Sequence, residues 1–307
     1  MSVDFCGLQL AHRVINGSGT FDAIAARRAF GPALDEDFPF AAYVSKTITL
    51  QAREGNPPPR LWETPGGLIN SIGLPNKGLA AYVAEDLPEL TGLRVRPRGP
   101  GAAQSMAVPV ITNVMGSTAD EFATLVEACE EREEIAAIEL NVSCPNVKTG
   151  LDIGADPDEL ARMVAQVRPR TRKPLIVKLT PNAADVARCA QAAEAGGADA
   201  VSLINTLRAM ALSGRGEGHP AGAWLGGGTG GLSGPAVRAV ALAQVAAVAA
   251  AVRIPVIGMG GVQTPGHARD MIDAGATLVA VGTESFRDPA AGARIAHGTA
   301  GYGPPQS

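Results

Sequence analysis

Short runs of consecutive apolar residues recur along the chain, and most lack the apolar–polar alternation of a strand with one face in water. Parallel strands that are buried on both faces have this pattern. The runs therefore predict eight buried strands, over residues 13–16, 42–46, 109–113, 136–141, 175–179, 200–204, 255–258 and 277–281.

Helical patterns separate many of these runs. Thr118 and Glu121 have the spacing of a capping box, and the apolar residues Phe122, Leu125 and Val126 follow on one helix face. Eight strands that alternate with helices predict an α/β fold, the (β/α)₈ TIM barrel, as a single domain over residues 1–307. Further helices are predicted over 156–167, 182–195, 235–252 and 265–274.

Three segments fall outside this alternation. Residues 3–12 predict a short hairpin ahead of the barrel. Residues 49–109 and 207–234 form two long insertions, the first rich in Pro and Gly and the second rich in Gly. Long loops in a compact domain are usually lids or binding loops, so we expect both at the active site.

Composition excludes several classes of function. The net charge of −4 gives no reason to expect binding to nucleic acid or to an anionic membrane surface, and no apolar run is long enough to span a bilayer. The N-terminal segment lacks a basic region followed by an apolar one, so we expect no signal peptide. The four cysteines have neither disulfide nor metal spacing, which favours a reducing, cytoplasmic location. Cys129 and Cys189 fall inside predicted helices and are expected to be packing residues.

Candidate chemistry gathers where the predicted strands end, which is where the active site of such a barrel forms. The pairs Gly260-Gly261 and Gly282-Thr283 follow the last two strands and leave backbone N–H groups bare ahead of helices. This arrangement favours a phosphate site, with a pair of tight turns as the alternative. No Gly-x-Gly-x-x-Gly motif follows a strand, so a Rossmann dinucleotide site is not expected.

The densest set of hydrogen-bonding and proton-transfer groups lies between Glu139 and Lys148. It holds two amides, a hydroxyl, the Cys144 thiol and an ammonium, just past a predicted strand. With no histidine at a predicted strand end, Cys144 and the lysines are the best candidates for proton transfer. A polar loop with one buried cysteine is the alternative interpretation.

Eight short motifs are spread in order over nearly the whole chain. They are Ser45-Lys-Thr-Ile-Thr49, Gly55-Asn-Pro-Pro-Pro-Arg60, Asn70-Ser-Ile-Gly-Leu74, Asn141-Val-Ser-Cys-Pro-Asn146, Val177-Lys-Leu-Thr-Pro181, Asn205-Thr-Leu207, Gly230-Gly-Leu-Ser-Gly-Pro235 and Gly258-Met-Gly-Gly261. These motifs resemble the class 1 dihydroorotate dehydrogenases, and their combination is most similar to the class 1B, NAD-linked catalytic subunit. Cys in the position of the catalytic base separates them from the membrane-linked class 2, which has Ser there.

The resemblance implies an FMN-containing barrel that oxidises dihydroorotate to orotate in pyrimidine synthesis. Cys144 matches the catalytic base of the family, and Lys46 acts beside it. The implied FMN contacts are Ser18, Lys46, Thr47, Asn113, Asn141, Lys178, Ile204, Gly234, Gly260, Gly261, Gly282 and Thr283. The implied substrate contacts are Lys46, Asn70, Ser71, Ile72, Gly73, Leu74, Asn141, Asn205 and Thr206.

The same resemblance implies a partner. Electrons would pass to NAD through a second subunit that carries FAD and a [2Fe–2S] cluster, around a homodimer core of a heterotetramer. A self-sufficient homodimer that uses fumarate is the alternative. Two other functions stay open: a dihydropyrimidine dehydrogenase-like FMN module for uracil-type substrates, and a non-catalytic barrel that binds a phosphate ligand.

Overall fold

The computed structural model describes residues 2–98, 104–142, 153–213 and 222–303. Eight parallel strands form a nearly closed barrel, and each of the eight predicted runs overlaps one of them, with ends within two residues of the prediction. Their order around the barrel is β3 (Val14–Asn16), β18 (Leu278–Val281), β17 (Val256–Met259), β12 (Ala200–Leu203), β11 (Leu175–Lys178), β10 (Ile135–Asn141), β9 (Val110–Val114) and β4 (Tyr43–Val44). The predicted (β/α)₈ TIM barrel is confirmed.

The barrel closes between β3 and β4 through a side chain. Asn16 Oδ1 accepts a hydrogen bond from Val44 N at 2.8 Å, and Asn16 Nδ2 donates to Val44 O, also at 2.8 Å. The side-chain amide therefore makes the pair of bonds that a neighbouring strand would make. Nearby, Ala41 N donates to Val14 O at 2.9 Å.

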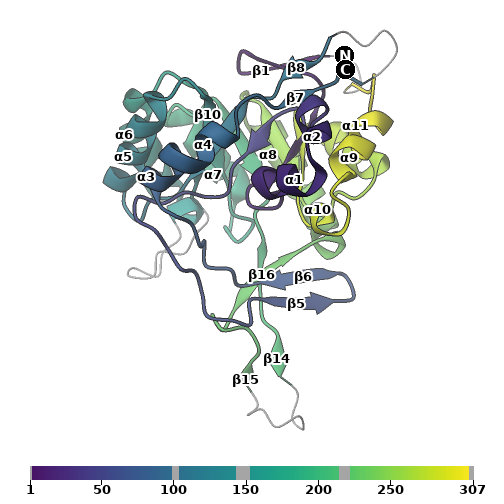
Figure 1. Ribbon diagram of the computed structural model, residues 1–307. Helices are drawn as coiled ribbons and strands as arrows, with labels where there is room; N and C mark the ends of the chain where they lie inside the picture. The colour runs from purple at the N-terminus through teal and green to yellow at the C-terminus, as the bar shows by residue number, and fades with distance from the viewer. Residues whose placement is uncertain (1, 99–103, 143–152, 214–221, 304–307) are drawn as a thin grey trace.

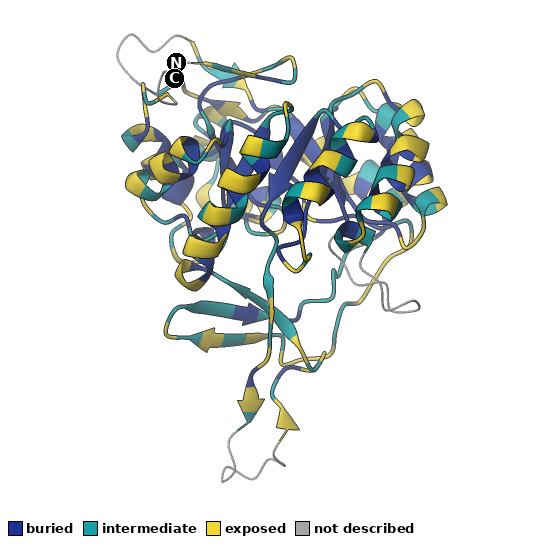
Figure 2. Ribbon diagram, turned by 180° about the vertical axis from the view of Figure 1, so that it is seen from behind, coloured by how far each residue is buried: buried dark blue, intermediate teal, exposed yellow. Residues whose placement is uncertain are grey.

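Helices surround the barrel and turn their apolar sides toward it, so that their outer sides are exposed (Figures 1 and 2). The capping box of Thr118 is confirmed in its first half, since Thr118 Oγ1 accepts from Glu121 N at 3.2 Å. The Glu121 carboxylate accepts from Ser117 N instead of from the capping residue. The longer helices are α1 (Ala23–Phe30), α5 (Ala119–Glu130), α6 (Pro157–Val167), α7 (Val186–Ala195), α8 (Arg238–Ala251), α9 (Pro265–Asp273) and α11 (Ala291–Gly298).

One predicted helix boundary was wrong. The helix predicted from residue 182 begins only at Val186, because Asp185 caps it by accepting from Arg188 N at 3.0 Å. Asn182 instead donates to Thr206 O at 3.1 Å and so joins two loops. The short helical elements are α2 (Ala33–Glu36), α3 (Leu79–Ala81), η1 (Tyr82–Asp86), α4 (Leu87–Glu89), η2 (Ile153–Ala155), η3 (Arg168–Arg170), η4 (Pro235–Val237) and α10 (Glu284–Arg287).

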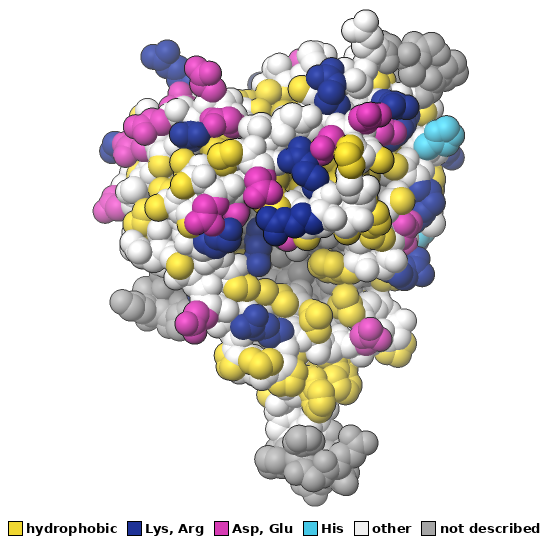
Figure 3. Space-filling view, in the orientation of Figure 1, with side chains coloured by type: hydrophobic (Ala, Val, Ile, Leu, Met, Phe, Trp, Pro, Cys, Tyr) yellow, Lys and Arg dark blue, Asp and Glu magenta, His cyan; other side chains and the backbone are white. Residues whose placement is uncertain are grey.

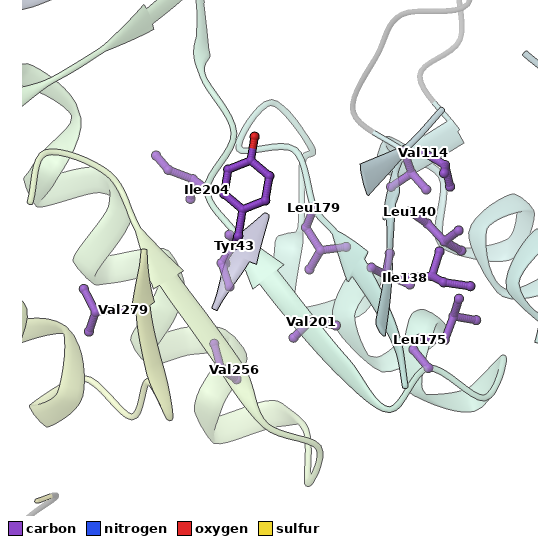
Figure 4. Packing of buried hydrophobic residues seen from close by; sticks show 14 of the residues in the cluster. Tyr43, Val114, Ile138, Leu140, Leu175, Leu179, Val201, Ile204, Val256 and Val279 are labelled. Atoms are coloured by element: carbon purple, nitrogen blue, oxygen red, sulfur yellow. The ribbon is translucent and has the colours of Figure 1, made fainter. Parts of the chain in front are cut away.

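The barrel strands separate two apolar cores. Alternate residues face opposite sides of a strand. Leu175 (Figure 4) and Val177 of β11 therefore belong to the core on the helix side, whereas Ile176 belongs to the inner core. The predicted N-terminal hairpin, β1 (Val3–Phe5) and β2 (Leu8–Leu10), is present, and Phe5 and Leu10 join the inner core. The amino ends of the strands are therefore closed by apolar side chains, which leaves the carboxyl ends for a site.

The two long insertions come together in one antiparallel sheet, which we call the insertion sheet. Its order is β13 (Leu207–Ala209), β16 (Gly230–Ser233), β6 (Gly67–Asn70) and β5 (Leu61–Thr64). It lies below the barrel in Figure 1, and β14 (Leu212–Ser213) with β15 (Gly222–Ala223) extends from it. Trp62 and Trp224, one from each insertion, pack edge to face at 5.2 Å between ring centroids. A further pair, β7 (Arg94–Val95) and β8 (Met106–Ala107), lies beside the hairpin.

Within the described ranges, the molecule has no helix of the length and apolar character that a bilayer span requires.

Candidate active site

The carboxyl ends of the barrel strands meet at one edge, and this edge faces the insertion sheet (Figure 1). The residues predicted to bind FMN and substrate lie at these ends, just after them, or on the insertions. Because parallel strands in a closed barrel share one edge, residues from positions 18 to 283 are gathered there.

A buried polar layer lies just inside this edge. Glu139 of β10 is 2% exposed and accepts two hydrogen bonds, from Asn113 Nδ2 at 2.5 Å and from Ser202 Oγ at 2.6 Å. Asn113 N donates to Ser45 Oγ at 3.0 Å, which fixes its backbone to the segment after β4. Asn113 Oδ1 is fully buried and has no hydrogen-bond partner among the residues the structure describes. That oxygen is an acceptor for an N–H or O–H group of a bound molecule.

A second hydrogen-bonded group links the predicted substrate residues. Asn141 Nδ2 donates to Thr47 Oγ1 at 3.2 Å, and Asn205 Nδ2 donates to Asn141 Oδ1 at 3.5 Å. Asn205 Oδ1 accepts from Thr206 N at 2.9 Å. Thr47 after β4, Asn141 at the end of β10 and Asn205 after β12 are therefore linked by hydrogen bonds.

Two lysines bring positive charge to the same edge. Lys178 ends β11 and is 6% exposed, whereas Lys46 follows β4 and is open to solvent. Neither ammonium group has a hydrogen bond or ion pair with any other part of the chain that the structure describes. The Lys178 side chain is thus largely enclosed by protein without an acceptor for its ammonium group among the described residues, and an anionic or carbonyl-rich ligand would supply acceptors.

The glycines predicted to bind phosphate are packed tightly against their surroundings. Gly261 has φ +68°, and a β-carbon there would come within 2.9 Å of Gly234 O and 2.7 Å of Arg238 Cβ. A β-carbon at position 260 would likewise come within 3.1 Å of Ile204 Cγ1. Thr283 Oγ1 donates to Ser233 Oγ of the insertion sheet at 2.8 Å. These predicted FMN contacts are thus brought together, although packing alone already requires glycine at two of them.

The predicted substrate loop, residues 70–74, belongs to the insertion sheet and its continuation. Asn70 Nδ2 donates to Gly231 O at 3.2 Å, and Ser71 Oγ donates to Thr229 O at 2.8 Å. Ile72 O accepts from Asn56 N, and Gly73 and Leu74 both have positive φ. A left-handed leucine is strained, so the surrounding contacts hold this loop in one shape.

Cys144, the predicted base, lies outside the described residues. Its flanks are placed: Val142 ends the described part of that segment, and Gly154 N donates back to Val142 O at 3.1 Å. Cys129 and Cys189 are buried in helices α5 and α7, as predicted for packing residues. Burial raises the pKa of Cys129 to about 12, so this thiol stays protonated at neutral pH.

Sequence reasoning did not assign a role to Glu139, Ser202 or Ser45, which complete the polar layer. One signal was present: Glu139 is a charged residue inside an otherwise apolar strand. Across the described ranges, no group of three or more His, Cys, Asp or Glu side chains could hold a metal ion.

An apolar-cored barrel with a polar, cationic carboxyl edge under a second sheet defines a class of small-ligand enzyme. The sequence model of the family described as "Dihydroorotate dehydrogenase" matches residues 1–300, so the chain belongs to this family of FMN-dependent oxidoreductases.

Curated relatives are similar over nearly their whole length. The "Dihydroorotate dehydrogenase B (NAD(+)), catalytic subunit" of Geotalea daltonii is 42% identical over 303 residues, which are 98% of this chain and 92% of that protein. The proteins of the same name from Pelobacter propionicus and Desulforudis audaxviator are 44% identical, over 299 and 296 residues. These matches cover 97% and 96% of this chain and 91% and 90% of the two relatives. The resemblance to the class 1B catalytic subunit is confirmed.

Proposed function

We propose that this chain oxidises dihydroorotate to orotate with FMN bound at the carboxyl edge of the barrel, and that Cys144 is the base. The observation that carries the proposal is the joined set of Asn141, Asn205 and Thr206. Lys178 is paired in register with Asn141, and its ammonium group has no hydrogen-bond or ion-pair partner among the described residues. Dihydroorotate is an anion with several amide-like groups, and amides with an ammonium group match it.

The residues present fit FMN. Asn113 Oδ1 is a buried acceptor without a partner in the described chain, and the pyrimidine ring of FMN has an N–H donor. The glycine edge at 260–261 and 282 exposes backbone near helix starts, as a phosphate requires. When bound, FMN takes up the hydride equivalent from the substrate. The residues proposed to hold it are Ser18, Lys46, Thr47, Asn113, Asn141, Lys178, Ile204, Gly234, Gly260, Gly261, Gly282 and Thr283.

The side chains of the chain have three tasks in this proposal. Cys144 takes the proton from the carbon beside the carbonyl group, which a thiolate can do when nearby cations stabilise it. Lys178 offsets negative charge at the pyrimidine edge of the cofactor. The amides and the loop residues 70–74 orient the substrate, and the insertion sheet, which faces the carboxyl edge of the barrel, excludes water.

The proposal includes a partner subunit. The proposed route takes electrons to NAD through FAD and a [2Fe–2S] cluster on that subunit, around a homodimer core. Support comes from the insertion sheet and its extension, where hydrophobic side chains gather at the surface (Figure 3), among them Leu61, Met210 and Leu212, each more than half exposed. Exposed apolar patches of this kind mark protein contacts.

An anaerobic half-reaction tests the proposal. The purified chain should carry an FMN spectrum, and dihydroorotate should bleach it while dihydrouracil, which lacks the carboxylate, should not. Bleaching by dihydrouracil at an equal rate would favour a uracil-type substrate. A chain that binds FMN but is bleached by neither would contradict the proposed reaction.

A further inference from the structure

We infer that Glu139 is a positioning residue for the flavin: it fixes the side-chain amide of Asn113 so that Oδ1, and not Nδ2, is left for the cofactor. The inference rests on the proposed function in so far as the ligand is FMN. It assigns a role to a residue that does not itself touch the ligand.

The position of Glu139 follows from strand geometry. Ile138 and Leu140 (Figure 4) belong to the core on the outer side of β10. Successive residues of a strand face opposite sides, so Glu139 between them points into the barrel. Glu139 is paired with Asn113 of β9 in the sheet register, and its second oxygen reaches Ser202 of β12, across the intervening strand β11. Lys178, at the end of β11, is paired in register with Ser202.

The chemistry of a carboxylate determines which way the amide turns. A carboxylate only accepts hydrogen bonds, so Asn113 must present its NH₂ group to Glu139. The carbonyl oxygen of the same amide then has no partner in the described chain, although it is fully buried. With a neutral amide in place of the carboxylate, Asn113 could turn over and present a donor to the flavin, whose own N–H would then have no acceptor.

Stability of the ligand-free fold gives no reason for this arrangement. A carboxylate buried inside an apolar strand is unfavourable compared with an aliphatic side chain, even with two hydrogen bonds. The buried carbonyl oxygen of Asn113, which has no partner in the part of the chain that the structure describes, adds a further unfavourable contribution. Both features become favourable when a donor from a ligand reaches Oδ1.

Two single variants and their combination test the inference by FMN titration of the apoprotein. Glu139→Gln should weaken FMN binding by about tenfold, because the amide of Asn113 loses its fixed orientation. Asn113→Asp should weaken it by more, because two carboxylates then face each other. In the double variant Glu139→Gln/Asn113→Asp, the amide introduced at position 139 can donate to the carboxylate introduced at position 113, whose other oxygen replaces Oδ1. Affinity should return to within about threefold of the wild type.

Ser202→Ala is the matched control, since it removes the other hydrogen bond of Glu139 and leaves the Asn113 contact in place. It should change FMN affinity by less than about threefold. The melting temperature of the apoprotein distinguishes a loss of cofactor positioning from a loss of fold stability. Glutamine has nearly the same shape as glutamate, so Glu139→Gln should melt within a few degrees of the wild type while its FMN affinity falls.

Three outcomes would overturn the inference: unchanged FMN affinity in Glu139→Gln, an equal loss in Ser202→Ala, or a double variant no better than Asn113→Asp alone. Measurements on the wild type show whether only the inference about Glu139 fails or the proposed function fails as well. If the wild type binds FMN and is bleached by dihydroorotate, the function stands and only the role of Glu139 is lost. If the wild type binds no FMN, both fall.

Discussion

Gly231 of the insertion sheet lies so close to Thr206 that a β-carbon at position 231 would come within 1.9 Å of Thr206 Oγ1. Thr206 follows barrel strand β12, and Gly231 O accepts the hydrogen bond from Asn70 Nδ2. Two predicted substrate contacts, one from the barrel and one from the first insertion, are thus spaced by a residue that has no side chain.

Gly231→Ala should therefore impair substrate binding more than cofactor binding. The added methyl group must push Thr206 and Asn70 apart, so we expect KM for dihydroorotate to rise about tenfold while FMN affinity stays within a factor of about three. Steady-state kinetics with an artificial acceptor measure this. Gly266→Ala is the control, because the atom nearest to a β-carbon at position 266 would be Thr264 Oγ1, 3.7 Å away. Equal KM values in the two variants would count against this role of Gly231.

Cys144→Ala should retain FMN and lose the reaction. We expect flavin bleaching by dihydroorotate to slow by about a hundredfold or more, because the proton on carbon has no base to receive it. Stopped-flow absorbance of the anaerobic half-reaction measures the rate. Cys6→Ala is the control: its thiol donates to Asp199 O, and burial first, then nearby Asp199 and Asp4, raise its pKa to about 11. Near wild-type bleaching by Cys144→Ala would eliminate Cys144 as the base.

His12 should make the fold sensitive to acid. Burial, with a smaller contribution from Arg98, lowers the pKa of His12 from 6.5 to about 3, so the folded protein keeps it neutral. Nδ1 accepts from Val14 N, as a neutral ring can. The unfolded chain binds the proton first, so this contribution to stability is full above pH 6.5 and falls as the pH drops toward 3.

The free energy of unfolding should thus drop by about 2 kcal/mol between pH 7 and pH 5 from His12 alone. Urea titrations at the two pH values measure the drop. In His12→Asn, Oδ1 can accept from Val14 N in place of Nδ1. This variant should show a drop in the free energy of unfolding that is smaller by about 2 kcal/mol. A drop of the same size in both proteins would show that other groups cause it.

The lone chain should be an incomplete NAD-linked enzyme. Its sequence has no dinucleotide fingerprint, so we expect rapid turnover with artificial dyes and slow or no reduction of NAD⁺. Addition of the partner subunit should restore NADH formation, which is measured by the absorbance of NADH. Rapid turnover of the lone chain with fumarate, or with NAD⁺, would instead support a self-sufficient enzyme.

The barrel could be predicted because its signal is local. Each buried strand is a continuous apolar run, and the polar residue that follows it is next in sequence, so Asn113, Asn141 and Lys178 were found at the strand ends. The substrate loop in the first insertion was predicted from the motif resemblance alone, because no periodic pattern of apolar residues indicates it.

The contacts between the insertions could not be predicted in the same way. Asn70 and Gly231 are separated by 161 positions, and nothing near either residue indicates the other. The role of Glu139 was missed for a related reason: its partners lie on β9 and β12, and only the closed sheet shows that they converge. The segment with Cys144 lies outside the described residues, so its role stays a prediction.

The composite origin of the insertion sheet limits how such enzymes can be recombined. Leu232 and Ile69 are neighbours in the sheet although they come from different insertions. A segment transplanted from a relative into one insertion would meet a foreign partner strand in the other. Substrate preference in this family should therefore be inherited through matched pairs of segments, and a chimaera that exchanges both together is the one we expect to keep a working site.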